Sequence, residues 1–429
     1  MNDKLIDKFI QFEEDYNLFE LQIFGISLWP VIRFRVYSLI YQKVNNTQIN
    51  HPKKNVFKSI ILIIKGSYLA LIKSPFFLKK KSTIIFNHPR KIINENGFYE
   101  CKYTEHLTGH DAYVFEIPFQ DRHYKPSQTP NLVYLDIILT LGRLNSIIGK
   151  FKYLKNADIN KIIKLKHSIE REFNVKIPDF ITLVKVLINK HKIISFLAKK
   201  ILKQIKPRQL IMTVAYSDIN LPFVEQAKRL GIKVIELQHG IMGGSHIAYN
   251  FYKIQNFNWY PDEIWVWNDF WANKSKFPII NEKIIVKGFP YLEKYKKERI
   301  INNENKKQII IISQGPFSDK LIDLTIKLNN KLNHKVYQIA YKPHPSELEA
   351  NVKNMDVLLK QNILISTDNN IYKVFNESYC QIGVNSTALF EGIELGLKTF
   401  VYKISGSEVL KDVENAIFIN DENDIIDNL

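Results

Sequence analysis

Short apolar runs alternate with longer amphipathic runs along most of the chain. Apolar runs of about four to eight residues are typical of buried strands, and longer runs with an i, i+3, i+4 pattern are typical of helices. The first half of the chain is therefore predicted to contain strands at Ser82–Phe86, Ala112–Glu116, Gln209–Val214 and Lys233–Leu237. We also expect a helix at Leu221–Leu230 and a basic helical region from about Leu135 to Lys206.

The alternation becomes regular after Lys306. We expect strands at Gln308–Ile312, Tyr337–Lys342, Ile363–Ile365, Gln381–Val384 and Thr399–Tyr402, and helices at Asp319–Leu332, Ser346–Leu359 and Ser386–Leu395. Strands that alternate with helices in this way form parallel sheets covered on both faces. The pattern predicts an α/β protein with two Rossmann-like domains, at 81–295 and 300–429, joined by a linker at Lys294–Lys307 and preceded by a basic helical extension at 1–80.

The length and composition agree with two globular domains. A single hydrophobic core stops growing near about 250–300 residues, and the chain has 429 residues, 45% of them hydrophobic and 24% charged. The two cysteines, Cys101 and Cys380, are too few for a disulfide framework or a cysteine-rich metal site. We therefore expect a reducing compartment, the cytoplasm.

The formal net charge of +17 is concentrated near the N-terminus, because the stretch Leu21–Asn94 has 13 Lys or Arg and no Asp or Glu. Within it, Val56–Lys73 is hydrophobic but contains lysines at 58, 65 and 73. A bilayer span needs about 20 mostly apolar residues. The segment is better suited to a helix lying on the inner face of the cell membrane, with its lysines on anionic headgroups. The alternative is a buried helix whose lysines reach solvent. Since nucleic-acid-binding motifs are missing from the sequence, we expect no nucleic-acid partner.

Candidate chemistry lies directly after the predicted strands, where ligands bind in open α/β sheets. In Gln238-His239-Gly240, a histidine beside glycine can approach a substrate and accept a proton from a hydroxyl nucleophile. The alternative is that His239 only forms hydrogen bonds inside a turn.

Three further strand ends carry polar residues suited to a nucleotide. In Lys342-Pro343-His344-Pro345, the prolines fix the backbone around His344, and Lys342 adds a second positive group for phosphates. Asn385-Ser386-Thr387 lies where a helix begins, so its amides and hydroxyls can bind an anion. Glu391 on that helix can accept hydrogen bonds from a ribose or base. Gln314 and Gly315 form a turn through which the chain can pass close to a nucleotide.

Together, Gln238-His239-Gly240, Lys342-Pro343-His344-Pro345 and Asn385-Ser386-Thr387 with Glu391 resemble GT-B-fold glycosyltransferases that build bacterial capsules and lipopolysaccharides. Similar groups are the sialyl-, polysialyl- and Kdo-transferases and the CDP-glycerol glycerophosphotransferases. The resemblance implies that His344, Ser386 and Thr387 hold the phosphate of a cytidine nucleotide donor and that His239 is the base. The acidic-acidic-Gly motif of the sialyltransferases is matched only in part, by Asn94-Glu95-Asn96-Gly97. The base therefore stays open between His239 and an acidic residue such as Glu95.

These observations lead us to expect a metal-independent glycosyltransferase without a cofactor. It would move a sugar from a nucleotide-activated donor to a glycan or lipid-linked glycan acceptor at the inner membrane face. A glycerophosphotransferase of the CDP-glycerol type and a nucleotide-sugar 2-epimerase are the alternative enzymes.

Overall fold

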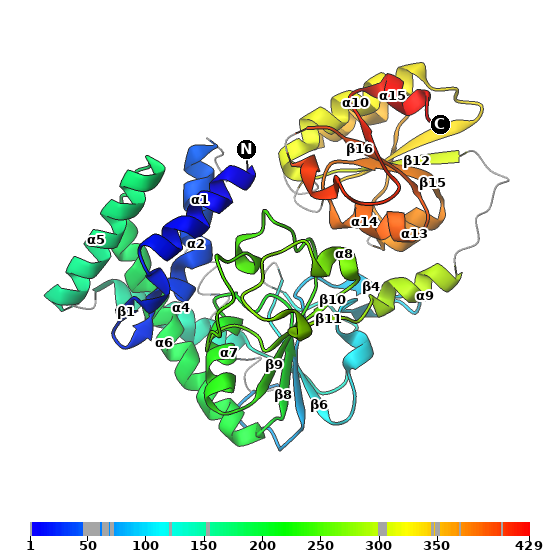
Figure 1. Cartoon of the computed structure of the whole chain (residues 1–429). Helices are drawn as coiled ribbons and strands as arrows, with labels where there is room; N and C mark the ends of the chain where they lie inside the picture. Colours follow the sequence, from blue (N-terminus) through cyan, green and yellow to red (C-terminus); the bar gives the residue numbers. More distant parts are fainter. Residues whose placement is uncertain are drawn as a thin grey trace. The chain divides into compact units, whose positions relative to one another are not determined.

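The computed structural model describes residues 2–45, 61, 68, 73–119, 122–151, 155–298, 307–344, 347, 352–368, 370–404 and 406–429. They form two compact units (Figure 1). The N-terminal unit contains the described residues of 2–91 and 97–287, and the C-terminal unit contains those of 92–96 and 288–429. Each unit has a parallel sheet with helices, and helices also begin the chain. The predicted fold class, two Rossmann-like α/β domains with an N-terminal helical extension, is confirmed.

The sheet of the N-terminal unit has seven strands in the order β11-β10-β9-β8-β3-β6-β7. All neighbouring pairs are parallel. The strands are β3 (Thr83–Phe86), β6 (Ala112–Glu116), β7 (Leu132–Tyr134), β8 (Gln209–Met212), β9 (Lys233–Leu237), β10 (Glu263–Val266) and β11 (Ile284–Val286). From β3 the chain builds β6 and β7 on one side and then returns to build β8 to β11 on the other. The strand order therefore reverses between β3 and β8, and ligands bind at such a reversal in doubly wound folds.

Both faces of this sheet are buried, because successive side chains of a strand point to opposite faces. Ile84 and Phe86 of β3 pack with apolar residues of α4 (Asp136–Phe151), α6 (Phe180–Ile205) and α7 (Asn220–Arg229). Ile85, between them, belongs to a separate cluster on the other face. The near-continuous apolar strands predicted from the sequence are thus explained by burial on both faces.

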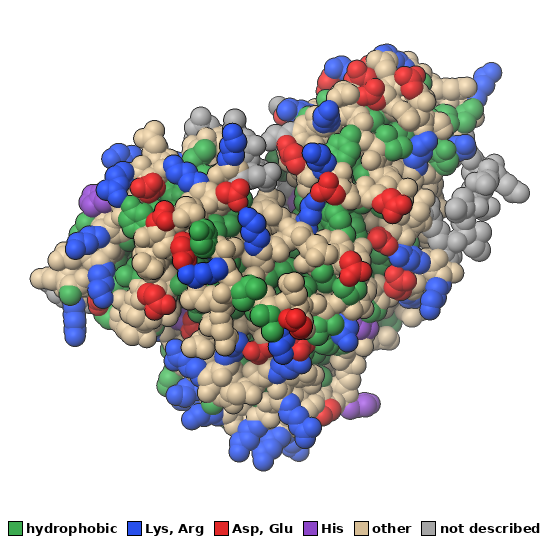
Figure 2. All heavy atoms as spheres, in the orientation of Figure 1, with side chains coloured by type: hydrophobic (Ala, Val, Ile, Leu, Met, Phe, Trp, Pro, Cys, Tyr) green, Lys and Arg blue, Asp and Glu red, His purple; other side chains and the backbone are tan. Residues whose placement is uncertain are grey.

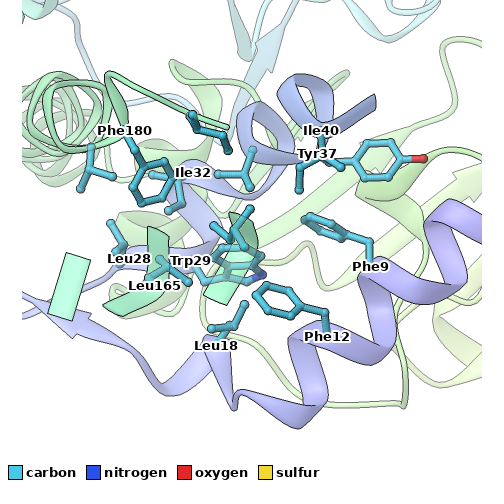
Figure 3. Close-up of a cluster of buried hydrophobic side chains, with 14 of the residues drawn as sticks. Phe9, Phe12, Leu18, Leu28, Trp29, Ile32, Tyr37, Ile40, Leu165 and Phe180 are labelled. Carbon is cyan, nitrogen blue, oxygen red and sulfur yellow. The ribbon is translucent and has the colours of Figure 1, made fainter. Parts of the chain in front are cut away.

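The N-terminal helices α1 (Asn2–Asp15) and α2 (Leu28–Val44) share a core with α5 (Asn156–Phe173) and α6 (Figure 3). Phe9 of α1 stacks on Trp29 of α2, with ring centroids 5.7 Å apart. Between the two helices lie the one-turn helix η1 (Leu18–Glu20) and a hairpin of β1 (Gln22–Ile23) and β2 (Ile26–Ser27). The extension is therefore built into the N-terminal unit by a hydrophobic core.

The predicted interfacial helix at Val56–Lys73 lies outside the described residues, apart from Ile61, Tyr68 and Lys73. It stays a prediction. Among the helices that the structure describes, none is long and apolar enough to cross a membrane. Figure 2 shows Lys and Arg side chains spread over the visible faces of both units, with Asp and Glu side chains among them.

The sheet of the C-terminal unit has six parallel strands in the order β14-β13-β12-β15-β16-β17. The strands are β12 (Lys307–Ile312), β13 (Tyr337–Lys342), β14 (Leu364–Ile365), β15 (Ser378–Gly383), β16 (Lys398–Tyr402) and β17 (Ala416–Ile419). The helices are α9 (Pro290–Glu298), α10 (Ser318–Lys331), α12 (Val352–Lys360), α13 (Ile371–Asn376), α14 (Thr387–Glu394) and α15 (Glu422–Ile426). Here the strand order reverses between β12 and β15, which places a second candidate ligand position at their carboxyl ends.

Several predicted segments differ from the structure. The strand predicted to end at Val214 ends at Met212, because Val214 has a left-handed backbone, and the strand predicted at Gln381–Val384 is Ser378–Gly383. The first residues of the predicted linker, Lys294–Glu298, belong to α9, because Leu292 and Tyr295 bury one face of that segment. Residues 299–306 lie outside the described part. The predicted helix at Ser346–Leu359 is described as α12 from Val352, since its first half is largely outside the described residues. Strands β7, β10, β11 and β17 were not predicted.

Candidate active site

Two histidines lie together at the point where the strand order of the N-terminal sheet reverses. His88 follows β3 and His239 follows β9. Their ring centroids are 5.7 Å apart and their planes are inclined by 29°. Tyr103 lies edge-on to both rings, at 5.5 Å from His88 and 6.5 Å from His239. Sequence analysis identified His239 but gave no role to His88, although His88 also follows a predicted strand, in Asn87-His88-Pro89-Arg90.

Burial sets the protonation of this pair. It lowers the pKa of His239 to about 4, with the charge of Arg90 acting in the same direction. Burial, and then the proximity of His239, also lower the pKa of His88 well below its ordinary value. Nδ1 of His88 accepts a hydrogen bond from the backbone N–H of Arg90 at 3.2 Å, so the neutral ring carries its proton on Nε2. Both rings are neutral at pH 7, and a neutral imidazole can accept a proton from a substrate hydroxyl.

The backbone around His239 is fixed by the side chain of Gln238, which is buried. Its oxygen accepts the N–H of Trp267 at 2.9 Å, and its nitrogen donates to the carbonyl of Gly240 at 3.0 Å. These bonds anchor the turn to the residue that follows β10. The histidine is therefore presented by a rigid strand end.

A buried carboxyl group lies three residues before His239. Glu236 is 1% exposed and accepts hydrogen bonds from the N–H of Ala215 at 3.0 Å and from the hydroxyl of Tyr249 at 2.8 Å. Burial raises the pKa of Glu236 to about 7. The adjacent Val214 has a φ of 55°, a value that is unusual for a β-branched residue and typical of strained functional turns.

The loop after His239 brings another half-buried histidine, His246, to this region. Nε2 of His246 lies 3.3 Å from the hydroxyl of Tyr216, which follows β8. Burial, and then the proximity of His239, lower the pKa of His246 to about 3. Sequence analysis assigned no site role to His246.

The other candidate base, Glu95, lies in a different setting. It belongs to the C-terminal unit, whereas His239 belongs to the N-terminal unit. Its carboxylate is exposed and lies 3.6 Å from Nζ of Lys294. An exposed ion pair of this kind contributes little energy. The assignment of Glu95 as a base stays a prediction.

In the C-terminal unit, the structure brings Gln314 and Asn385 together where its strand order reverses. Gln314 follows β12, and its side-chain oxygen accepts the backbone N–H of Asn385 at 3.1 Å. The side chain of Asn385 donates to the carbonyl of Gly406 at 3.1 Å. Ser386 caps α14 by accepting the N–H of Ala388 at 3.2 Å, and Thr387 is the first residue of the helix. Gly315, next to Gln314, begins a short helical turn.

Lys342 is the last residue of β13, the neighbour of β12, and His344 follows that strand. Hydrogen bonds fix the backbone at His344: its N–H donates to one oxygen of Glu347 at 2.6 Å, and the hydroxyl of Ser313 donates to the other at 2.8 Å. Nζ of Lys342 donates to the carbonyl of Ser366 at 3.3 Å. Burial lowers the pKa of Lys342, against the opposing charge of Asp368. Ser346, the first residue of the predicted helix at Ser346–Leu359, lies outside the described residues.

Glu391 differs in its surroundings from the other predicted nucleotide-binding residues. It is 1% exposed, and its carboxylate accepts a hydrogen bond from the hydroxyl of Tyr372. The Tyr372 ring stacks on Tyr295 of α9, with centroids 4.5 Å apart. In this arrangement Glu391 joins α14 to α13 and α9. Its role toward a ribose or base stays a prediction.

These residues can bind a phosphate group in the C-terminal unit. The first turn of α14 has backbone N–H groups without helical partners, and the helix dipole favours an anion there. Lys342 and His344 add positive charge or hydrogen-bond donors one strand away from β12. Within the described ranges, no group of three or more His, Cys, Asp or Glu side chains could hold a metal ion.

No protein-family model matches the chain, and no curated protein matches it. Solved structures with a similar fold include the UDP-GlcNAc 2-epimerase from Methanocaldococcus jannaschii in complex with UDP-GlcNAc and UDP, which is 12% identical with a TM-score of 0.45 over 81% of this chain and 91% of that one. The UDP-GlcNAc 2-epimerase from Neisseria meningitidis bound to UDP-GlcNAc is 11% identical, with a TM-score of 0.45 over 81% and 90%. The wall teichoic acid polymerase TagF is 13% identical, with a TM-score of 0.39 over 84% and 81%. At these identities and TM-scores, no activity or site residue of this chain follows from the likeness.

Proposed function

We propose that this protein is a glycosyltransferase that moves a sugar from a nucleotide-activated donor, with a cytidine nucleotide favoured, to a glycan acceptor of a surface polysaccharide. The observation that carries the proposal is the set of residues found where the strand order reverses in each of the two sheets. The reversal in the C-terminal unit carries groups suited to a nucleotide phosphate, and the reversal in the N-terminal unit carries a neutral histidine pair.

The C-terminal unit supplies the donor site in this proposal. The phosphates lie at the first turn of α14, beside Asn385 and Ser386, with Lys342 and His344 as positive or hydrogen-bonding groups. The backbone of each strand end is held by a hydrogen bond to a side chain, that of Gln314 on one side and that of Glu347 on the other. Such preorganised donors stabilise the negative charge that develops on the leaving nucleotide.

The N-terminal unit supplies the base. A nitrogen of His239 takes the proton of an acceptor hydroxyl while the hydroxyl oxygen forms a bond to the donor sugar carbon. The bond from that carbon to the phosphate oxygen breaks, and the electron pair leaves with the nucleotide. A neutral imidazole is required for this step, and burial keeps His239 neutral well below pH 7.

The proposal also includes the cellular location of the enzyme. We propose that the basic segment around residues 53–81 holds the enzyme at the cytoplasmic face of the cell membrane, where lipid-linked acceptors are found. The charge of that segment supports this placement, since lysines near an anionic surface each contribute on the order of 1 kcal/mol.

The experiment is a donor screen with the purified full-length protein. Nucleotide release is measured across CMP-, CDP-, UDP- and GDP-linked donors, with and without capsule-type acceptors. We expect release from one donor class that depends on acceptor and falls at least about 100-fold in His344→Ala, since the loss of preorganised charge stabilisation costs that much.

His334 provides a matched control because it is a histidine of the same unit that precedes β13 instead of following it, and its Nε2 lies 2.9 Å from the carbonyl of Asn329. His334→Ala should retain turnover. If the protein transfers glycerol phosphate from CDP-glycerol, then the reaction at this site is phosphotransfer and not sugar transfer. Acceptor-independent isomerisation of a nucleotide sugar would overturn the transferase proposal.

A further inference from the structure

A groove of about 280 Å³ lies between α2 and the loop that carries His246. Its lining is Phe34, Tyr37, Ser38, Tyr41, Ser245, His246 and Ile247. We infer that this groove is a carbohydrate subsite that binds one or two neutral sugar units of the acceptor glycan. The inference rests on the proposed function, because it assigns the acceptor of that reaction to a place on the N-terminal unit.

The lining combines aromatic rings with hydroxyl groups. The Phe34 ring lies 5.0 Å from that of Tyr216 and 6.1 Å from that of His246, with the last pair stacked. Although α2 is mostly buried, Phe34 is 44% exposed. An aromatic face offers a flat apolar surface for the C–H face of a pyranose. The hydroxyls of Ser38 and Ser245, which can both donate and accept, suit sugar hydroxyls.

The charge of the lining residues determines which classes of ligand can bind in the groove. The seven described lining residues include no Lys, Arg, Asp or Glu, and burial keeps His246 neutral by lowering its pKa to about 3. Among the described lining residues, a phosphate or an anionic lipid headgroup would lose its hydration without gaining a cationic partner. Ile247 is the single aliphatic side chain of these seven residues, so they also suit a lipid chain poorly. A neutral polyhydroxylated ring fits both observations.

The groove shares a loop with the candidate base, His239. His246 and His239 belong to one loop, and the pKa of His246, lowered first by burial, is lowered further by the proximity of His239. A glycan bound along α2 would therefore present a neighbouring unit toward the loop of the base.

The walls of the groove are held rigid by Arg33 of α2. Its guanidinium donates to the carbonyl of Ile247 at 2.5 Å and to that of Asn250 at 2.7 Å. Glu13 of α1 binds the same guanidinium through both of its oxygens. A site formed before the ligand arrives loses less entropy on binding. Helix α2 of the N-terminal extension thus becomes one wall of the subsite.

The test is direct binding of neutral sugars to the full-length protein, without any donor. Saturation-transfer NMR is recorded with methyl β-galactoside, methyl N-acetyl-β-glucosaminide, lactose and diacetylchitobiose. We expect at least one to bind, and its affinity to fall about tenfold or more in Phe34→Ala, which removes the stacking face, and in Ser245→Trp, which fills the groove. Phe196→Ala is the matched control, because Phe196 is a 53% exposed phenylalanine on α6 of the same unit.

Four outcomes are informative. Loss of sugar binding in Phe34→Ala and Ser245→Trp, with CMP and UDP binding unchanged, supports the subsite. Sugar binding that is equal in all variants, or no binding of any of the four sugars to the wild type, overturns it. If the sugars bind at Phe34 but no nucleotide sugar is turned over, the subsite stands and the transferase proposal fails. If turnover occurs and its acceptor KM is unchanged in Phe34→Ala, only the subsite fails.

Discussion

The rings of His88 and His239 lie nearly parallel with their centroids 5.7 Å apart, on either side of the position where β8 ends. The pKa of His88, lowered first by burial, is lowered further by the proximity of His239. His239→Asn should reduce turnover by about 10²–10⁴-fold, which is the range for loss of a general base. The same change should raise the pKa of His88, because it removes a neighbour that contributes to lowering it. Turnover assays and an NMR titration of the histidine Cε1–H signals measure the two effects.

The control for this prediction is His110→Asn, since His110 is an exposed histidine of the same unit. It should leave both turnover and the His88 titration unchanged. An unchanged pKa of His88 in His239→Asn would show that the two rings do not interact in solution. Unchanged turnover in the same variant would remove His239 from the role of base and return attention to Glu95.

Glu236 predicts a specific dependence of stability on pH. Its pKa is raised by burial from 4.5 to about 7, so in this window the folded protein holds a proton that the unfolded chain has released. The free energy of unfolding therefore falls as pH rises from about 4.5 to 7, by about 3 kcal/mol at about 1.4 kcal/mol per pH unit. Glu236→Gln, which mimics the protonated form, should remove this fall. Urea unfolding at pH 5 and pH 8 measures the difference between the variants.

The exposed residue Glu282 serves for comparison, because Glu282→Gln should follow the wild-type curve at both pH values. If Glu236→Gln also follows the wild-type curve, then Glu236 is ionised in the folded protein near pH 5 and is stabilised by a partner other than its neutral hydrogen bonds.

Strands and strand-end residues could be predicted where a single physical cause, such as burial of both faces of the sheet, determined the pattern of apolar residues. Ile309–Ile312 is apolar throughout because both faces of β12 are buried, and the observed strand differs from the predicted Gln308–Ile312 by one residue. In contrast, β10 (Glu263–Val266) was missed although Ile264–Trp267 is an apolar run after Glu263. A short apolar run is compatible with either a strand or a buried helix, and only the pairing with β9 and β11 identifies this one as a strand.

The same distinction applies to the candidate site. His239 and His344 were found because each directly follows a recognisable strand and lies beside glycine or proline. The partnership of His88 with His239 depends on the strand order, in which β8 separates β3 from β9. The partnership of Arg33 with the carbonyls of Ile247 and Asn250 depends on the docking of α2 against a distant loop. Neither relationship leaves a local pattern in the sequence.

Gly406 lies against the side chain of Asn385, a residue of the proposed donor site. It has a φ of +102°, and a Cβ there would lie 2.9 Å from the side-chain nitrogen of Asn385. Gly406→Ala should therefore displace Asn385 and weaken nucleotide binding by about tenfold, the loss of roughly one charge-free hydrogen bond. It should also lower stability by about 1–2 kcal/mol through its left-handed backbone. Isothermal titration with CMP, CDP and UDP measures the affinity.

Gly288 separates the two effects, because it has a φ of +74° in the same unit but no heavy atom within 4 Å of its added Cβ among the residues described. Gly288→Ala should lose a similar amount of stability while keeping its nucleotide affinity. Equal affinities in the two alanine variants would mean that Asn385 does not contribute to the nucleotide site.

The buried ion pair of Glu13 and Arg33 predicts strong coupling between two substitutions. Nε of Arg33 lies 2.5 Å from Glu13, both side chains are at most 5% exposed, and the indole of Trp29 also donates to Glu13 at 2.6 Å. Removing one partner leaves the other charge buried, so Glu13→Gln and Arg33→Met should each lower the free energy of unfolding by about 3–5 kcal/mol. The double variant should lose less than the sum of the two, because neither charge is then left unpaired. Urea denaturation of the four proteins gives the coupling energy, and additive losses would show that the pair is solvated in solution despite its burial in the fold.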